Sequence, residues 1–341
     1  MIPAISYDAA FLLPLVWAGI IGLAVVMYVL LDGYDLGIGL LFPLARGESE
    51  RDAMMMSIKP YWDGNETWLI LGGGGLLVAF PRAYSIIMPA LYLPLIVMLL
   101  GLIFRGVSIE FRALAADKRG WNWGFTLGSA AAGFAQGVML GGLIQGIATD
   151  GAQFTGGTFD WLTPFALACG VGTLIGYALL GATWVIMKTS GRTAEDARRH
   201  AAYALVGVIA FMAIVSLWTP LAFPRIAERW FTLPNFFFFS PVPLCTAGAA
   251  FACLWGLARG KDIVPFAAAM ALFLLGYSGL VISVFPYLVP PKLTIWDVAA
   301  ATSSQTFMLV GTAVLLPVIL GYTVFVYWLF RGKVREGESY H

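Results

Sequence analysis

The chain has 341 residues, of which 60% are hydrophobic and only 11% charged, and its formal net charge is +1. Soluble domains carry about 25% charged residues, and a net charge near zero argues against nucleic acid as a partner. Runs of about 20 apolar residues, each long enough to cross ~30 Å of hydrocarbon as a helix, recur from end to end. The composition therefore predicts an all-α polytopic integral membrane protein that forms a single transmembrane domain over residues 1–341.

Nine stretches have the length and apolar character of a membrane-spanning helix. In chain order we predict crossings at 9–31, 57–80, 84–106, 122–147, 162–187, 200–222, 241–258, 263–285 and 304–330. The first helix can continue to residue 45. No basic segment precedes it, so we expect a retained helix rather than a cleaved signal.

The distribution of basic residues tests this topology independently. The even-numbered connections hold only four of the twenty Lys and Arg residues, namely Arg82, Arg225, Arg229 and Lys292. The other sixteen, Arg335 included, lie in the odd-numbered connections and after the last crossing. Because basic residues concentrate on the cytoplasmic side of membrane proteins, we predict an outer N-terminus and a cytoplasmic C-terminus.

Glycines spaced by four residues indicate where helices pack closely. Gly133, Gly137 and Gly141 follow this spacing in one predicted crossing, and Gly172 and Gly176 follow it in the next. Small residues at this spacing let helix backbones approach each other. Residues 72–75 are four consecutive glycines, which weaken a helix and suggest a close neighbour, a bend or a wide turn.

Two acids, Asp32 and Asp35, lie near the inner end of the first predicted crossing. They are three residues apart and therefore share one face of a helix. One interpretation is that the membrane ends near Leu31 and that both acids are solvated or cap an interface. The other is a proton entry mouth, since a charge at membrane depth costs at least ~2.5 kcal/mol and usually marks a functional site. The apolar run 36–42 favours a buried setting.

A second acidic pair, Asp63 and Glu66, lies in the second predicted crossing between Trp62 and Trp68. If that helix begins near Asp52, then Asp63 lies about 16 Å along it, roughly in the middle of the membrane. Burial would raise the pKa of such a carboxyl group and allow reversible proton carriage near neutral pH. The alternative is a structural acid that is hydrogen-bonded at a helix interface.

Polar residues also end the third crossing and precede the last one. Arg105, Glu110 and Arg112 fit a cytoplasmic anchor of snorkelling arginines, or alternatively an ion pair from Arg105 to one of the acids above. The segments 294–297 and 302–306 place Asp297 and a hydroxyl-rich turn at the start of the last helix. Helix capping and hydrogen bonds at a helix interface explain most of these polar residues.

Several kinds of site have no support in the sequence. His200 and His341 are the only histidines, so no intramembrane pair is available to hold a haem. The three cysteines predict neither a disulfide framework nor a zinc site, and the methionine run 54–56 reads as helix surface or packing. Nucleotide-binding and hydrolase motifs are missing as well. We therefore expect no catalytic residue, metal or redox centre within this chain.

Five blocks of the sequence closely resemble, in order, subunit II of cytochrome bd-type quinol oxidases. They are LDGYDLGIGLL, IKPYWDGNETWLILGGGGLLVAFPRAY, FRGVSIEFR, LTIWD and TSSQTFMLVGTAVLLPVILGYTVFVYW. The resemblance covers residues 15–333. It is closest in the first 112 and last 45 residues and rests mainly on hydropathy between 115 and 285.

The resemblance implies nine helices, arranged as two four-helix bundles plus one peripheral helix. It also implies a partner, subunit I, that holds two b-type haems and a haem d, or a b-type haem in place of haem d. The complex would sit in the bacterial cytoplasmic (inner) membrane, oxidise quinol near the outer face and reduce O2 to water with cytoplasmic protons, which is electrogenic without pumping. Some members hold a structural quinone in this subunit, and small accessory subunits are further candidate partners. The short connections and the Glu66 variant are similar to the cyanide-insensitive branch, which favours a partner with b-type haem only.

The resemblance also suggests roles for individual residues. It implies that Asp63 belongs to a proton path, with Asp32 and Asp35 in the same path or supporting it. Glu66 stands where some members have an uncharged glutamine. Interface or structural support is expected from Trp62, Asn65, Arg105, Asp297, Ser303 and Ser304.

Two other classes of protein remain alternatives. A proton-coupled secondary transporter also needs intramembrane acids, but such folds often contain two repeats with broken helices at matching positions. The four-glycine run has no obvious counterpart in the second half of the chain. A membrane scaffold would need no acids at depth. The predicted function is therefore a non-haem subunit of a quinol oxidase.

Overall fold

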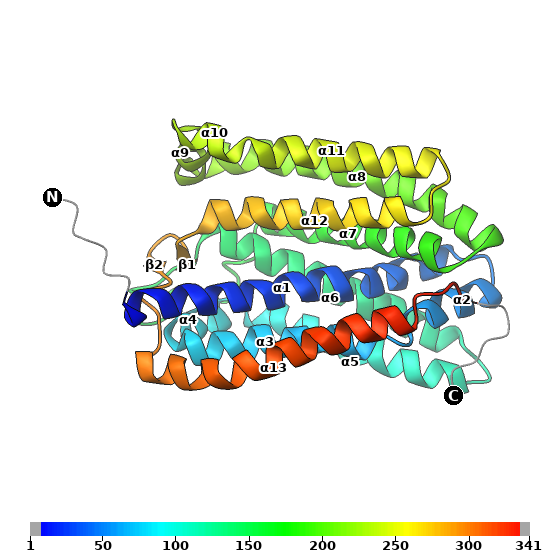
Figure 1. Ribbon diagram of the computed structural model, residues 1–341, viewed down its shortest axis with the longest axis horizontal. Helices are drawn as coiled ribbons and strands as arrows, with labels where there is room; N and C mark the ends of the chain where they lie inside the picture. The colour runs from blue at the N-terminus through cyan, green and yellow to red at the C-terminus, as the bar shows by residue number, and fades with distance from the viewer. Residues whose placement is uncertain (1–7, 335–341) are drawn as a thin grey trace.

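The computed structural model describes residues 8–334 and is almost entirely helical (Figure 1). Residues Arg335 and His341 lie outside the described part. The elements in order are α1 (Ala9–Leu41), the 3-10 helix η1 (Phe42–Leu44), α2 (Glu48–Ile58), α3 (Trp62–Ala79), α4 (Pro81–Ala90), α5 (Tyr92–Leu114), α6 (Arg119–Gln145), α7 (Pro164–Lys188), α8 (Gly191–Ala222), α9 (Pro224–Phe231), α10 (Asn235–Phe239), α11 (Pro241–Ala258), α12 (Ile263–Val284), β1 (Tyr287–Val289), β2 (Leu293–Thr294) and α13 (Thr302–Leu329).

Eight stretches in the described part are long and apolar enough to cross a membrane. They are Ala9–Leu44, Tyr92–Leu114, Arg119–Gln145, Pro164–Lys188, Gly191–Ala222, Asn235–Ala258, Ile263–Val284 and Thr302–Leu329. The prediction of an all-α polytopic membrane protein is confirmed. The remaining predicted crossing corresponds to α3, whose 18 residues begin with a polar turn and include four consecutive glycines. The count of nine and the two-bundle arrangement therefore stay predictions.

Three predicted helix boundaries are wrong. The crossing predicted to start at residue 200 belongs to α8, which begins at Gly191. The stretch 57–80 is interrupted by a turn at residues 59–61, so α2 and α3 are separate helices. The stretch 84–106 begins inside the short α4, which Pro81 opens, and α5 starts only at Tyr92. Because α5 then continues to Leu114, Arg105 lies in its interior and not at its end.

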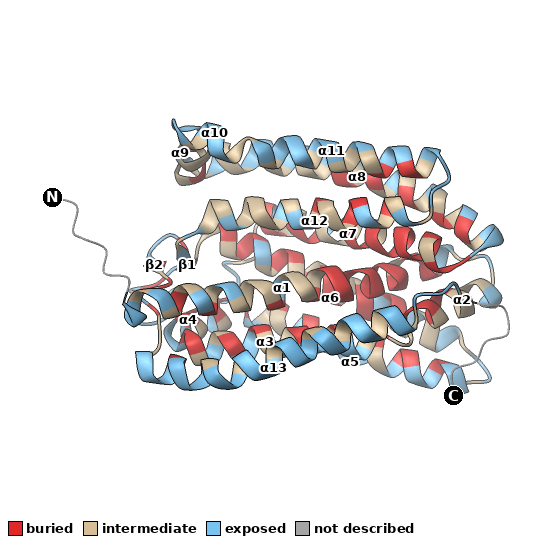
Figure 2. Ribbon diagram, viewed as in Figure 1, coloured by how far each residue is buried: buried red, intermediate tan, exposed pale blue. Residues whose placement is uncertain are grey.

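The C-terminal half of α1 forms the centre of the fold. It lies beside α3, α6 and α7, and nearly every residue from Tyr28 to Leu41 along it is buried (Figure 2). In contrast, α11 and α13 are mainly exposed in Figure 2. The α13 helix runs along the outside of α1 and α3, with few buried side chains of its own.

Glycines mark the closest helix contacts, as the spacing predicts. A Cβ atom on Gly137 would lie 2.4 Å from the carbonyl oxygen of Cys169, and one on Gly37 would lie 1.8 Å from that of Tyr177. Of the three alternatives predicted for the four-glycine run, the structure confirms the close neighbour. Its outer members, Gly72 and Gly75, face α1, whereas the middle two have open space around them and α3 continues through all four.

Candidate functional site

The centre of the site is a buried arginine between two carboxylates from different helices. Arg105 of α5 donates from one guanidinium nitrogen to Asp32 of α1 at 2.5 Å and from the other to Glu66 of α3 at 2.9 Å. The side chains of Arg105 and Asp32 are fully buried, and that of Glu66 is 30% exposed. The predicted ion pair of Arg105 is confirmed. The snorkelling alternative is wrong for this residue, because it lies inside α5.

Asp35 is held beside this ion pair by an amide. It is fully buried, and Asn65 Nδ2 of α3 donates to its Oδ2 atom at 2.8 Å. The interpretation of Asp32 and Asp35 as solvated acids is therefore wrong, because α1 continues for six residues beyond Asp35 within the core. The structure brings together three of the four acids that the sequence singled out.

Asp63, the fourth acid, does not join the cluster. It lies in the first turn of α3 and is exposed on the surface of the single chain. The expectation of a position 16 Å along a continuous helix is wrong, because the turn at residues 59–61 separates α2 from α3. Neighbouring Trp62 is half-buried close to Gly106 of α5, so it supports the contact between these two helices.

A set of tyrosines and a lysine, none of them predicted from the sequence, completes the polar core. The hydroxyl groups of Tyr34 on α1 and Tyr327 on α13 are 2.5 Å apart, and both bond to Asn65. Buried Lys188 of α7 donates to the Tyr61 hydroxyl and to the backbone oxygen of Phe330. The position of Tyr34 between the two acids of the first block could have marked it as a site residue. Tyr327 had no such mark, because it is 262 residues away from Asn65 in the sequence.

The segment before α13 has a mainly structural role. Asp297 is exposed, and hydrogen bonds from the hydroxyl and backbone N–H of Thr294 hold its pKa below its ordinary value. Ser303 and Ser304 are exposed at the start of α13, and no side chain within residues 8–334 caps that helix. The helix-interface contact expected of this segment comes instead from buried Gln305, which donates to the backbone oxygen of Ala79.

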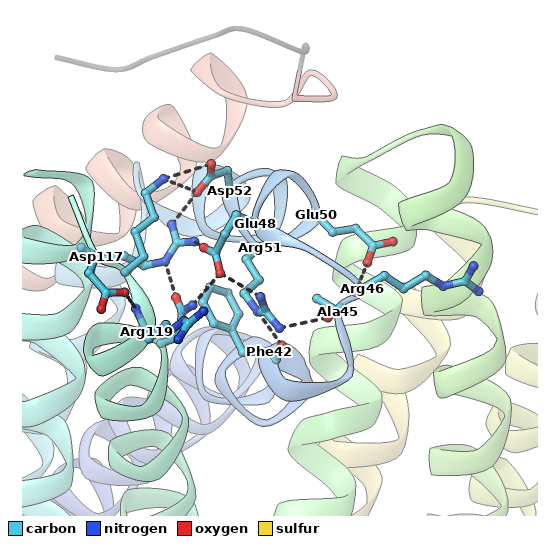
Figure 3. A network of polar contacts seen from close by, with 12 residues as sticks. Phe42, Ala45, Arg46, Glu48, Glu50, Arg51, Asp52, Asp117 and Arg119 are labelled. Atoms are coloured by element: carbon cyan, nitrogen blue, oxygen red, sulfur yellow. Dashed lines mark hydrogen bonds and ion pairs between the residues drawn. The ribbon is translucent and has the colours of Figure 1, made fainter. Parts of the chain in front are cut away.

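A second polar network ties α2 to the predicted cytoplasmic end of the fold. Arg112 of α5 is 3% exposed and bonds to Asp52 at 2.6 Å and to Glu48 at 2.7 Å. Lys118 also bonds to Asp52, at 3.0 Å. Figure 3 shows Glu48, Arg51 and Asp52 on α2, with Arg51 turned toward the backbone at the end of α1.

Asp52 gives this network a defined pH dependence. Partial burial alone would raise the pKa of Asp52, but hydrogen bonds and charge from Arg112 and Lys118 outweigh it and hold the pKa below its ordinary 3.8. An acid whose pKa is lower in the folded state stabilises that state at pH values above its pKa in the unfolded chain. This stabilisation is lost as the pH falls through the pKa of the folded state. We expect hydrogen exchange of α2, corrected for intrinsic rates, to accelerate below about pH 4.

An Asp52→Asn variant should show faster α2 exchange already at neutral pH and a flatter acid response. The effect should stay below about 1 kcal/mol, because the Asp52 side chain is 44% exposed. Asp117→Asn is the matched control, since Asp117 is an exposed acid that accepts from the nearby Arg119 backbone N–H. Equal exchange of α2 in Asp52→Asn and wild type would show that these ion pairs do not hold α2.

The residues around the described histidine do not fit a haem. His200 of α8 lines a cavity of about 20 Å³ together with Asp196, Glu50 and Met54. That volume holds one water molecule. We therefore place no haem chemistry on His200.

These observations define an α-helical integral membrane protein that is built around a buried arginine–carboxylate cluster. The chain belongs to the cytochrome bd terminal oxidase subunit II family, whose model matches residues 13–330. The resemblance of the sequence blocks to that family is thereby confirmed.

Individual relatives agree with this assignment. The chain is 30% identical over 367 aligned positions to cytochrome bd-I ubiquinol oxidase subunit 2 of Escherichia coli K12, with 95% of each chain covered. It is 27% identical to cytochrome bd ubiquinol oxidase subunit 2 of Bacillus subtilis, with 94% of this chain and 97% of the relative covered. Its fold matches a chain of the solved bd oxidase from Geobacillus thermodenitrificans with a TM-score of 0.79 at 15% identity, covering 94% and 98% of the two chains.

Proposed function

We propose that this chain is the non-haem subunit of an electrogenic quinol oxidase in the bacterial cytoplasmic membrane. It stabilises a haem-bearing partner, subunit I, and contributes a path for the cytoplasmic protons that combine with O2 and quinol electrons to give water. The names of the E. coli and B. subtilis relatives support ubiquinol as the class of reductant.

The observation that carries this proposal is the group of carboxylates around one arginine inside the helix bundle. Asp32, Asp35 and Glu66 lie near a single cation, Arg105, so the acids outnumber the positive charge that balances them. Groups of this kind are costly within a membrane and usually mark ion or proton routes. The Oδ1 atom of Asp35 is buried and has no hydrogen-bond partner within residues 8–334, so it is available to bind a proton.

The outward side of α3 is the proposed contact with the partner subunit. Its exposed residues recur at helical spacing, as one stripe: Asp63, Thr67, Ile70, Gly74 and Leu77. Small residues allow another helix to approach closely, and a partner on this stripe shields Asp63 from lipid. Asp63 then lies at the subunit boundary, one helical turn from Glu66, and connects the partner with the buried cluster.

The topology proposed for the complex places the proton entry on the cytoplasmic side. The four basic residues assigned to the outer side gather at one end of the fold, where Arg82 bonds to Gly151 and Lys292 bonds to Thr149. The Arg112 network lies at the other end, close to the inner ends of α1 and α5. This arrangement supports a topology with the N-terminus outside and the C-terminus in the cytoplasm.

An Asp63→Asn variant tests the proton path. The complex is purified in mild detergent through a tag on this chain, and its haem is counted from the reduced-minus-oxidised spectrum, which also shows whether haem d is present. We expect quinol-driven O2 uptake per haem to fall about 100-fold, the lower end of the loss for a missing proton-transfer group. The haem content should remain at the wild-type level.

Glu110→Gln is the matched control, because Glu110 is an exposed acid on α5. It should retain turnover. Full turnover and full electrogenicity of Asp63→Asn would refute the proton-path role. A preparation from aerated cells with neither haem nor a partner would refute the oxidase role and favour a proton-coupled transporter.

A further inference from the structure

Three side chains from three helices form a closed hydrogen-bonded ring next to Asp35. They are Tyr34 of α1, Asn65 of α3 and Tyr327 of α13. The two hydroxyl oxygens are 2.5 Å apart, Tyr327 donates to Asn65 Oδ1 at 2.9 Å, and Asn65 Nδ2 donates to the Tyr34 hydroxyl at 2.9 Å. Tyr34 and Asn65 are 0% and 1% exposed, so water does not compete with these bonds.

With the Asn65 amide oriented as in the structure, the ring runs in one direction. A tyrosine hydroxyl has one hydrogen to donate, and that of Tyr327 goes to Asn65 Oδ1. Tyr34 must therefore donate to Tyr327, and its own oxygen accepts from Asn65. Each group then donates once and accepts once around the ring, an arrangement in which hydrogen bonds reinforce one another.

The direction of the ring decides what Asn65 presents to Asp35. With Oδ1 committed to Tyr327, the amide turns its Nδ2 atom toward Asp35 Oδ2, 2.8 Å away. An amide rotated by half a turn would present its oxygen to the carboxyl group, and its Nδ2 atom would face the Tyr327 hydroxyl, which would then accept instead of donate. The hydrogen bond from Tyr327 to Oδ1 therefore stabilises the amide orientation in which Nδ2 faces Asp35.

Tyr327 is brought to this position by the inner end of an otherwise exposed helix. Just beyond it, the backbone oxygen of Phe330 accepts from the Tyr61 hydroxyl at 2.6 Å and from Lys188 Nζ. Lys188 also donates to the backbone oxygen of Gly332 at 3.1 Å. A cation at the carboxyl end of a helix is favourable, so these bonds hold α13 at the level where its hydroxyl meets Asn65.

We infer that Tyr327 is a positioning residue for Asp35, acting through the Asn65 amide, and that α13 serves to deliver it. This inference rests on the proposed function, because Asp35 matters to turnover only if it belongs to the proton path. The ring couples a helix on the surface of this chain to a carboxyl group in its centre.

The test compares Tyr327→Phe with Tyr322→Phe in the purified complex. Tyr327→Phe removes the hydroxyl but keeps the aromatic side chain packed against that of Tyr61, with 4.6 Å between the two ring centroids in the wild type. Tyr322 lies on the same helix and is 64% exposed. For Tyr327→Phe we expect kcat per haem to fall about fivefold, the rate equivalent of one hydrogen bond. The KM for quinol should be unchanged and the solvent deuterium isotope effect larger, whereas Tyr322→Phe should match wild type.

Two further variants separate the possible failures. Asp35→Asn reports on the proposed path itself: full turnover in that variant would refute the role of Asp35, and the inference with it. Low turnover in Asp35→Asn with wild-type kcat and isotope effect in Tyr327→Phe would overturn the inference alone. If Tyr327→Phe does not assemble, Tyr34→Phe breaks the same ring from α1 and is read by the same criteria.

Discussion

Replacing Arg105 with glutamine is expected to prevent assembly of a stable complex. The wild-type guanidinium bonds to Asp32 and Glu66, and both Arg105 and Asp32 are fully buried. Removing one partner of a buried ion pair costs about 3–5 kcal/mol, because it leaves the other charge without compensation. The neutral amide of glutamine is shorter than arginine and cannot reach two carboxylates on separate helices. The contact between α1, α3 and α5 should therefore loosen.

Two quantities measure the effect. They are the yield of haem-containing complex recovered through a tag on this chain and the temperature at which half of that complex is lost. Arg46→Gln is the matched control, since Arg46 is 56% exposed in its pair with Asp196, and exposed pairs contribute about 0–1 kcal/mol. Arg105→Lys should give an intermediate yield, because lysine keeps the charge but not the forked geometry. Wild-type yield and thermal stability of Arg105→Gln would show that the cluster does not hold these helices together.

The sequence predicted the buried acids for a physical reason that the structure supports. The apolar residues after Asp35 require that α1 continues into the core, and fully buried Asp32 then needs a cation. Arg105 is the basic residue of the third predicted crossing, so its pairing with an acid could be stated as an alternative in advance. Such a prediction needs only the apolar pattern of one helix and the presence of one basic residue that can neutralise the buried acid.

Other parts of the site were beyond reach because they depend on contacts between distant segments. The turn before Trp62 leaves no strong mark in an apolar stretch, and missing it put Asp63 at the wrong depth. Tyr327 looks like an ordinary interfacial aromatic residue until α13 is placed beside α3. The sequence predicts structural support from Ser303 and Ser304 and not from Gln305, because only the packing of α13 shows which side of its first turn is buried.

Substituting Gly37 with alanine is expected to have the second large effect, through the contact between α1 and α7. An alanine Cβ would lie 1.8 Å from the carbonyl oxygen of Tyr177 and 2.8 Å from the backbone nitrogen of Gly181. Both neighbours are backbone atoms of α7, so no side chain can rotate to make room. Overpacking of this kind costs about 1–3 kcal/mol, and we expect the upper end of that range.

The displacement of α1 should also reach the site, since Asp35 lies only two residues before Gly37. We expect Gly37→Ala to lower both the thermal stability of the purified complex and its O2 uptake per haem, as Asp35 moves away from Asn65. Gly276→Ala is the control: Gly276 is exposed on α12 with open space where a Cβ would lie, so its variant should match or exceed wild type in both measurements. Normal stability and turnover of Gly37→Ala would mean that α1 and α7 can separate without disturbing the carboxylate, and that the close helix contact is not what positions Asp35.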